Sequence, residues 1–472
     1  MKNCVVTIIT FLILILAGCQ SGSDKPNIIL MMADDLGWGD TGFNGNKEIM
    51  TPHLDKLAGK GLIFNRFYSA SPVCSPTRAS CLTGRNPYRM GIPTANSGHL
   101  PKSEITLAEI LREEGYATGH FGKWHLGTFT STIKDANRGK PGNEDHMSIP
   151  TDHGFDEFFS TESKVPTWDP MIRPDSFNIE AGENLRYGWT APVSKTDSVF
   201  YGTRYWTAAE EPVYNNLEGD DSRVIIDRAI KFIERSVRES TPFFSVVWFH
   251  APHLPVVVTE EYKSRFAGKP NNIQLYYGSI SALDEQIGRL WNTLEINNVE
   301  KNTLIFFCSD NGPENRTPGS AGLFRGRKRD LYEGGIRVPA FVVWGDRIEP
   351  GRVTDYPAFT SDYLPTIVDL LKLSYSDPGH DLDGTSISEA LYRHESLREK
   401  PMGFLYPGRM SWVTNQYKLI SNDKGSTFEL YDILNDPHEK NNIIDSSPRI
   451  RKKLKSEFDK WMGSVMNNSF LE

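Results

Sequence analysis

Apolar runs alternate with amphipathic helical patterns along most of this chain. Residues 27–33 form an unbroken apolar stretch, which is typical of a strand covered on both faces of a sheet. Strand alternating with helix predicts an α/β fold in which helices flank a large, mixed but mostly parallel sheet. The other apolar runs occupy residues 243–249, 304–308 and 338–343, and the helical patterns occupy 224–237, 280–294 and 364–373.

Local signals mark the ends of several helices. Thr51-Pro52 predicts the start of one helix, and Thr106-x-x-Glu109 is a capping box that predicts the start of another. Gly115 then predicts the end of that second helix.

Periodicity is lost between residues 129 and 220, which are rich in Pro, Gly, Trp and charge. This predicts an irregular insert that lies over one face and shapes the substrate site. After about residue 400, short strands are predicted at 412–414, 417–421 and 428–431, followed by an amphipathic helix at 450–461. The predicted organisation is a catalytic domain over 26–400 and a C-terminal subdomain over 401–472, built of a small antiparallel sheet with one helix.

Polar clusters directly follow four apolar runs: 27–33, 116–121, 243–249 and 304–308. Because the carboxyl ends of parallel strands form the ligand-binding edge of an α/β sheet, these clusters are expected to converge. The clusters are Asp34-Asp35, Lys123 with His125, His250 with His253, and Asp310-Asn311.

The residue types in these clusters suggest a cation and an oxyanion. Carboxylate and amide oxygens favour Ca²⁺ or Mg²⁺ over Zn²⁺, although paired acidic residues also occur as plain turn or N-cap residues. Lys123, Arg78 and a divalent cation would neutralise a tetrahedral oxyanion. His125 and His250 are candidate proton carriers, and a purely structural role is the alternative interpretation for His253.

The most informative stretch begins at Cys74, in Cys74-Ser-Pro76-Thr-Arg78. Pro76 suits the first helical position, Gly84 suits the helix end, and Arg78 lies one turn after the thiol on the same face. A buried, inert thiol is the alternative interpretation.

Taken together, the motifs resemble those of type I sulfatases, in the sulfatase order. The resemblance extends from about residue 26 to beyond 441 and implies an alkaline-phosphatase-like fold. The motifs are Asp34-Asp35-x-Gly37, Cys74-x-Pro76-x-Arg78, Gly122-Lys-Trp-His-Leu-Gly127, His250-Ala-Pro252, Ser309-Asp-Asn-Gly312, Tyr332-Glu-Gly-Gly-Ile-Arg-Val-Pro339 and Asn435-Asp-Pro-x-Glu439.

The resemblance implies that Cys74 is oxidised to formylglycine (3-oxoalanine), whose hydrate attacks sulfur. The oxidation requires a formylglycine-generating or anaerobic sulfatase-maturating enzyme as a partner. One Ca²⁺ per chain is implied, with Asp34, Asp35, Asp310, Asn311 and the modified Cys74 as ligands.

The same resemblance assigns roles to the basic residues. Arg78 and Lys123 support the diol and sulfate oxygens, His125 helps to release sulfate, and His250 assists departure of the leaving oxygen together with Lys328. The match at Lys328 is looser, because Arg327 stands where the family often has Gly.

The implied substrate is a sulfated carbohydrate, with a lean towards a 4-O-sulfate on galactose or N-acetylgalactosamine. A phosphodiesterase or phosphonate monoester hydrolase of the same superfamily, an inactive glycan-binding surface lipoprotein and a purely structural lipoprotein are the alternatives. Candidate substrate contacts are Trp168, Arg173, Arg204 and His253.

The first residues predict export. A short basic start, an apolar stretch at 5–16 and Leu16-Ala-Gly-Cys19 resemble a bacterial lipoprotein signal over 1–18, with Cys19 lipidated and 19–25 as a polar tether. The expected location is the periplasm or the cell surface, anchored to a membrane. Five cysteines in this pattern give no disulfide framework, and the net charge of −8 argues against a nucleic-acid partner.

Overall fold

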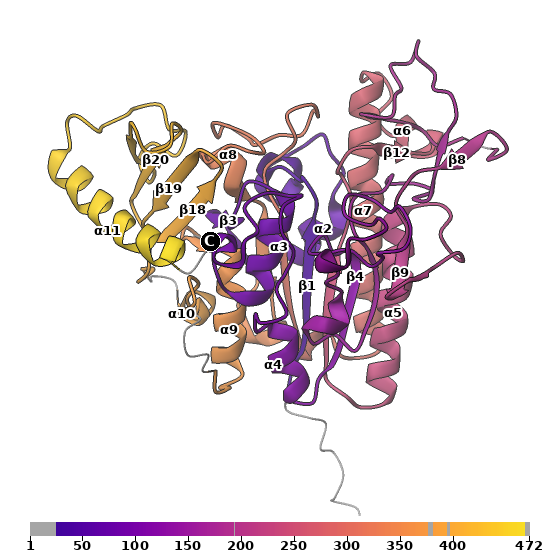
Figure 1. Cartoon of the computed structure of the whole chain (residues 1–472), viewed down its shortest axis with the longest axis horizontal. Helices are drawn as coiled ribbons and strands as arrows, with labels where there is room; N and C mark the ends of the chain where they lie inside the picture. Colours follow the sequence, from indigo (N-terminus) through magenta and orange to yellow (C-terminus); the bar gives the residue numbers. More distant parts are fainter. Residues whose placement is uncertain (1–24, 193, 376–380, 394–396, 468–472) are drawn as a thin grey trace, which may run out of the picture.

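The computed structural model describes residues 25–192, 194–375, 381–393 and 397–467. Its centre is a ten-stranded sheet with the order β10-β9-β5-β4-β11-β1-β13-β15-β2-β16 (Figure 1). The strands are β1 (Asn27–Ala33), β2 (Leu62–Phe64), β4 (Ala117–Lys123), β5 (Glu157–Thr161), β9 (Tyr205–Ala208), β10 (Glu211–Pro212), β11 (Phe243–Trp248), β13 (Thr303–Ser309), β15 (Ala340–Val343) and β16 (Arg352–Thr354).

Five adjacent strands in the middle of this sheet, β5, β4, β11, β1 and β13, are parallel. Their registers align the strand ends, since Lys123 pairs with Thr161 and Ala33 pairs with Ser309. Antiparallel pairing begins on either side, at β9 and at β15. The predicted fold class, a large and mostly parallel mixed sheet with helices, is confirmed.

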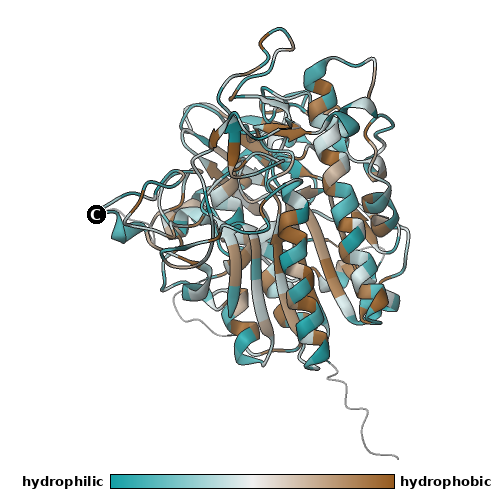
Figure 2. Cartoon of the chain, turned by 90° about the vertical axis from the view of Figure 1, so that its right-hand side faces the viewer, coloured by the Kyte–Doolittle hydropathy of each residue, from teal (hydrophilic) through white to brown (hydrophobic). Residues whose placement is uncertain are grey.

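Helices cover both faces of the sheet, and the alternation along β1 shows why its sequence is apolar throughout. Leu30 belongs to a core formed with α3 (Cys74–Thr83), α4 (Leu107–Glu113) and α9 (Tyr363–Leu370). Met31 points to the other face, towards α2 (Pro52–Ala58), α5 (Asp221–Arg238) and α7 (Asn271–Ile296). Figure 2 shows apolar strands enclosed by helices that carry polar residues along part of their surface.

The predicted helix signals occur where expected, with one shift. Thr106 and Glu109 form the capping box that begins α4. Gly84 ends α3 in a left-handed conformation at φ 71°, which an L side chain rarely adopts. However, α3 already begins at Cys74, so Pro76 is the third helical residue rather than the first.

The stretch expected to be irregular contains strands of the main sheet. β5, β9 and β10 all lie between residues 129 and 220. The run Glu157–Thr161 is only five residues long and follows a Gly-Phe-Asp turn, so its apolar content is too short to stand out in the sequence. The remaining strands of this region form small pairs, β6 (Ile172–Pro174) with β8 (Ser198–Phe200), and β7 (Gly188–Thr190) with β12 (Val256–Val258).

A four-stranded antiparallel sheet and a long helix follow residue 400 and lie beside the main sheet; Figure 1 draws the four-stranded sheet in gold and the helix in yellow. The first strand, β18, was not predicted, because its run is bounded by Pro401 and Pro407 and contains Gly403. The elements are β18 (Met402–Tyr406), β19 (Arg409–Val413), β20 (Tyr417–Ser421), β21 (Glu429–Asp432) and α11 (Pro448–Asn467). Within the described ranges, no helix combines the length and apolar character needed to cross a membrane.

A buried ionic network joins this small sheet to helix α8 (Glu333–Ile336) of the main domain. Lys418 on β20 lies 3.0 Å from Glu333 on α8 and 2.9 Å from Glu439, and all three side chains are buried. Three further strands, β3 (Phe67–Tyr68), β14 (Arg337–Val338) and β17 (Ala358–Phe359), form a separate small sheet, and two short helices are α6 (Glu260–Ser264) and α10 (Ser388–Tyr392).

Replacing Lys418 by methionine is expected to destabilise the protein by about 3–5 kcal/mol, since buried Glu439 loses its ion pair and buried Glu333 keeps the longer one with Arg337, at 3.3 Å. Chemical denaturation of the variant would measure this loss. Lys453→Met is the control, because that side chain is 74% exposed and its ion pair with Glu457 spans 3.9 Å; we expect a change within about 0.5 kcal/mol. Equal losses for both variants would contradict the interpretation.

Candidate active site

The ends of the five parallel strands surround one polar cavity of about 350 Å³. Three strands contribute lining residues directly after their ends: His125 after β4, Lys164 after β5 and His253 after β11. Asp34, after β1, contacts the lining residues Cys74 and Lys123, and Asp310, after β13, accepts a hydrogen bond from the Asp35 amide. The cavity is lined by Val73, Cys74, Thr94, Ala95, Asn96, Lys123, His125, Asn137, Ser163, Lys164, His253, Glu314, Arg316, Lys328, Arg329 and Tyr406.

The acidic residues converge as expected from their strand-end positions. Ligand atoms of Asp34, Asp35, Cys74 and His253 all lie within 4.8 Å of one another. The next strand end joins them, because Asp310 Oδ1 accepts a hydrogen bond from the Asp35 amide at 3.1 Å. Asn311 Nδ2 also donates to Asp35 Oδ1 at 2.6 Å.

This group has the chemistry of a hard-cation site. Asp35 Oδ2 and Asn311 Oδ1 are buried and accept no hydrogen bond from any described residue. Burial raises the pKa of Asp310, and so does the like charge of Asp34, while Arg78 opposes the rise. Buried oxygens without donors, in a set dominated by carboxylates, fit Ca²⁺.

Three cations enclose the acidic group, and each contacts a carboxylate. Lys123 Nζ lies 2.6 Å from Asp34 Oδ2, and Arg78 Nη2 lies 2.7 Å from Asp310 Oδ2. Lys328 Nζ lies 2.6 Å from Asp35 Oδ1 and 3.7 Å from the sulfur of Cys74. The Arg78 guanidinium also packs over the ring of Trp248, 5.2 Å from its centroid.

Cys74 begins α3 and is buried at the base of the cavity, 3.6 Å from Asp34 Oδ1. Burial raises the pKa of its thiol to about 12, although Lys123 and Lys328 act in the opposite direction. The thiol is therefore protonated at neutral pH and is a weak nucleophile in its unmodified form.

Two residues at the strand ends adopt backbone conformations that are rare for side chains other than glycine. Asp35 has φ 65° and His125 has φ 59°. The Ser75 hydroxyl holds the second of these turns by donating to the His125 carbonyl at 2.6 Å. Such conformations persist where the surrounding structure fixes them, and they are concentrated at functional sites.

The structure corrects the expectation for His250. Its Nδ1 lies 2.8 Å from Asp221 Oδ2 and its Nε2 lies 2.7 Å from the Thr161 hydroxyl, so both ring nitrogens are occupied within the protein. His250 is fully buried and is absent from the cavity lining. It therefore braces the end of β11 against β5 rather than facing the cavity.

His253, three residues later, faces the cavity instead. Its Nδ1 is 2.6 Å from the Leu254 carbonyl, which leaves Nε2 directed towards Asp35 Oδ2 at 3.6 Å. Burial, followed by the charges of Lys328 and Lys123, lowers the pKa of His253 well below its usual value. His125 also lines the cavity, with Nε2 3.4 Å from Asn96 Oδ1, and burial and Lys123 lower its pKa likewise.

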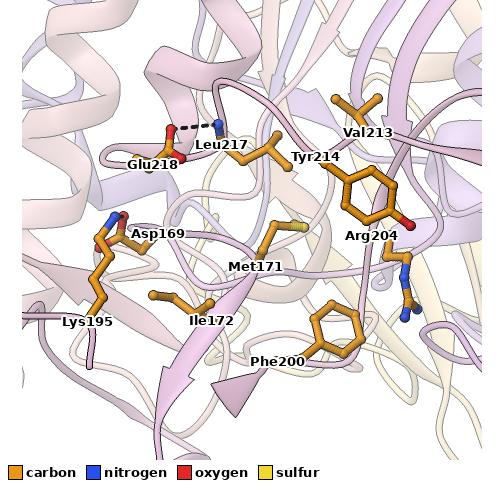
Figure 3. A pocket seen from close by; sticks show the side chains of 10 residues that line it. All are labelled: Asp169, Met171, Ile172, Lys195, Phe200, Arg204, Val213, Tyr214, Leu217 and Glu218. Atoms are coloured by element: carbon orange, nitrogen blue, oxygen red, sulfur yellow. Dashed lines mark hydrogen bonds and ion pairs between the residues drawn. The ribbon is translucent and has the colours of Figure 1, made fainter. Parts of the chain in front are cut away.

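The other three candidate substrate contacts lie outside this cavity. Trp168 packs against Tyr262, and Arg173 donates to the Pro174 carbonyl on β6. Arg204 lines a separate hollow in the insert, where its guanidinium lies 4.3 Å from the centroid of Phe200 (Figure 3). None of these three is among the described residues of the catalytic cavity lining.

Several cavity residues were missed from the sequence. Lys164 follows β5 as the other clusters follow their strands, so it would have been found had that strand been predicted. Asn96, Asn137 and Arg316 lie on loops without periodicity, and Tyr406 is at the end of the unpredicted β18. No comparable sequence signal marks these four residues.

Comparison with known proteins agrees with this geometry. The profile of the family described as Sulfatase matches residues 26–373, and that of N-sulphoglucosamine sulphohydrolase, C-terminal, matches 319–463. Human arylsulfatase D is 30% identical over 90% of this chain and 78% of its own length. Dog N-acetylgalactosamine-6-sulfatase is 33% identical over 85% of this chain and 72% of its own length.

Solved structures give the same assignment. The crystal structure of Ps i-CgsB in complex with k-i-k-neocarrahexaose superposes with a TM-score of 0.78 at 28% identity, covering 94% of each chain. The fold is thus alkaline-phosphatase-like, as the sequence motifs implied. A family profile over most of the chain, relatives above 30% identity and a matching fold lead to one conclusion: this chain belongs to the sulfatase family and is a sulfuric ester hydrolase.

Proposed function

We propose that this enzyme hydrolyses sulfate esters of glycans through an oxidised Cys74. The observation that carries the proposal is the convergence of Cys74, Asp34 and Lys328 at the base of one polar cavity. Once oxidised to formylglycine and hydrated, residue 74 would supply the nucleophile for attack on sulfur. Asp34, Asp35, Asp310, Asn311 and residue 74 would hold Ca²⁺, which would supply positive charge beside the sulfate group.

Of the three inner cations, Lys123 and Lys328 bind and orient the sulfate, and Arg78 positions the strand ends. Lys123 and Lys328 are paired with different carboxylates, Asp34 and Asp35, and both line the cavity, where they can donate to sulfate oxygens. Arg78 is fixed by Asp310 and by the Lys123 carbonyl at 3.0 Å, so it holds the strand ends in place. Donors fixed before the reaction need no reorganisation as charge develops.

Proton transfer is assigned to the two histidines of the cavity. His253 replaces His250 as the group that protonates the departing sugar oxygen, because its Nε2 faces the cavity. A bound sulfate brings negative charge among Lys123 and Lys328, which favours the protonated ring. His125, on the Asn96 side of the cavity, is assigned to proton removal from the sulfated intermediate during sulfate release.

The proposed substrate is a sulfated glycan with galactose-configured units, with a lean towards a 4-O-sulfate. The names of relatives support the sugar class, since two of the similar proteins are an N-acetylgalactosamine-6-sulfatase and Ps i-CgsB bound to k-i-k-neocarrahexaose. A panel of galactose and N-acetylgalactosamine oligosaccharides sulfated at O4 or O6 would test it, with released sulfate as the readout. Greater kcat/KM on an aryl phosphodiester than on aryl and glycan sulfates would instead favour the phosphodiesterase alternative.

Ca²⁺ is expected to stabilise the folded protein. A ligand that binds only the folded state at 100 times its Kd contributes about 2.7 kcal/mol, so chelation should lower Tm and added Ca²⁺ should restore it. Asp35→Asn should abolish most of this shift, because it removes a charged ligand. Asp346→Asn, whose side chain is 85% exposed, is the matched control and should retain it. A Tm that is insensitive to Ca²⁺ in the wild-type protein would contradict the metal assignment.

We also propose the lipid-anchored location. It rests on the Leu16-Ala-Gly-Cys19 motif, which lies outside the residues that the structure describes. Metabolic labelling with a fatty acid, compared between the wild-type chain and Cys19→Ala, would test it.

A further inference from the structure

Besides the inner cations Arg78, Lys123 and Lys328, the site has a second group of cations that line the cavity. Lys164, Arg316 and Arg329 line it together with Glu314 and Tyr406. Arg316 and Arg329 have side chains that are 56% and 46% exposed, whereas Lys123 and Lys328 are buried. We refer to Lys164, Arg316 and Arg329 as the rim cations.

The inner and rim cations differ in how they are neutralised. Each inner cation has a carboxylate within 2.7 Å, namely Asp34 for Lys123, Asp35 for Lys328 and Asp310 for Arg78, and Asp34 also lies 3.6 Å from Arg78. Among the described residues of the rim, by contrast, Glu314 is the only carboxylate. It lies 3.0 Å from Arg329 and 3.6 Å from Arg316, so it is shared between two guanidinium groups.

Lys164 has no such partner. Its ammonium group makes no hydrogen bond or ion pair with any residue in the described part of the chain, although the side chain is half-buried. Burial lowers its pKa, and so do the charges of Lys123, Lys328 and Arg316, while the charge of Asp35 opposes them. A half-buried cation among other cations is unfavourable unless a ligand brings negative charge.

Lys164 reaches the cavity from the segment after β5, whereas Lys123 is the last residue of β4 and Lys328 belongs to the segment after β13. Lys164 lies three residues beyond Thr161, the β5 residue that pairs with Lys123 at the end of β4. The chain has thus left the sheet edge before it reaches Lys164. The ammonium group faces the same cavity from the β5 side, while Arg316 and Arg329 reach it from the segment after β13.

We propose that Lys164, together with Arg316, binds a second anionic group of the substrate, adjacent to the ester that is cleaved. This inference rests on the proposed function and deepens it, because it limits the preferred substrates to glycans with more than one negative charge. A second sulfate and a uronate carboxylate present the same anionic oxygens, so both are candidates. Arg329 is mainly held by Glu314 and contributes charge rather than a free donor.

The test compares Lys164→Met and Lys164→Arg in the matured enzyme on matched disaccharides. All carry the ester that the wild-type enzyme cleaves; their neighbouring sugar is neutral, sulfated or a uronate. The preference for an anionic neighbour is the kcat/KM on the charged disaccharide divided by that on the neutral one. Lys164→Met should reduce this ratio by about 10- to 100-fold, which corresponds to the loss of one charged hydrogen bond. Lys164→Arg should restore most of it, and the uronate arm shows which anion is preferred.

Binding gives a second readout without turnover. In a Cys74→Ala background, calorimetry with the same disaccharides should show the affinity for the anionic neighbour falling when Lys164→Met is added. Lys453→Met, an exposed lysine on α11, is the control and should keep the wild-type preference.

Different results would refute the second anionic subsite and the sulfatase function. If Lys164→Met lowers kcat/KM equally on all three disaccharides, Lys164 contacts the reacting sulfate and the second subsite is refuted. If the wild-type enzyme shows no preference for an anionic neighbour, the subsite is likewise refuted while the sulfatase function stands. If the matured wild-type enzyme releases no sulfate from any of the O4- or O6-sulfated oligosaccharides of the first panel, the proposed function itself fails.

Discussion

Replacing Cys74 by alanine is expected to abolish sulfate release, with a loss on the order of 10⁴-fold or more in kcat/KM. The substitution removes the one side chain at the base of the cavity that can be converted to the nucleophile, and it leaves Lys123, Lys328 and the acidic group in place. Sulfate release from the glycan panel, measured by ion chromatography, would check the result. Mass spectrometry of the peptide that contains residue 74 would show whether the wild-type protein carries the oxidised form.

The matched control is Cys81→Ala, two turns later on the same helix. Cys81 is fully buried against the core, and burial raises its pKa well above the usual value, with Cys308 adding to the rise. Its sulfur does not line the cavity, so we expect a loss of stability of about 1 kcal/mol with turnover close to wild type. Activity in Cys74→Ala equal to that of this control would refute the mechanism.

The sequence predicted the fold well where apolar runs are long and strands are central. Asn27–Ala33 is apolar at nearly every position because both of its faces are covered by helices, so its limits are clear in the sequence. The rule that ligands bind at the carboxyl ends of parallel strands then placed Asp34 and Asp310 at one sheet edge, where both carboxylates lie within 3.6 Å of the Arg78 guanidinium. The limits of the strand and the place of the two aspartates both follow from where each apolar run ends, and the sequence shows that point directly.

The same rule failed where a strand was hidden. β5 is short, and missing it also meant missing Lys164. Spacing alone also could not separate His250 from His253, since both follow β11 within a few residues. Their orientation depends on partners distant in sequence. The two ring nitrogens of His250 contact Asp221 at the start of α5 and Thr161 on β5. Contacts of this kind appear only when the tertiary structure is known.

His253→Ala is expected to lower kcat/KM on glycan sulfates by about 10²- to 10⁴-fold, the usual range for the loss of a general acid. The reason is that a sugar alkoxide is a poor leaving group and needs a proton as the sulfur–oxygen bond breaks. A nitrophenolate leaves without that proton, so the loss on 4-nitrophenyl sulfate should be smaller by at least about tenfold. The ratio of the two losses is the measurement that assigns the role.

His250→Ala provides the contrast, because it removes a buried brace rather than a group that contacts substrate. Asp221 would keep its hydrogen bond from the Tyr205 hydroxyl at 2.6 Å but lose the imidazole, and the Thr161 hydroxyl would lose its partner at the end of β5. We therefore expect a lower Tm and similar losses on the glycan and aryl substrates. If instead the leaving-group dependence followed His250 and not His253, the proton donor would be the histidine that the structure buries, and the orientation of the loop after β11 would have to differ during turnover.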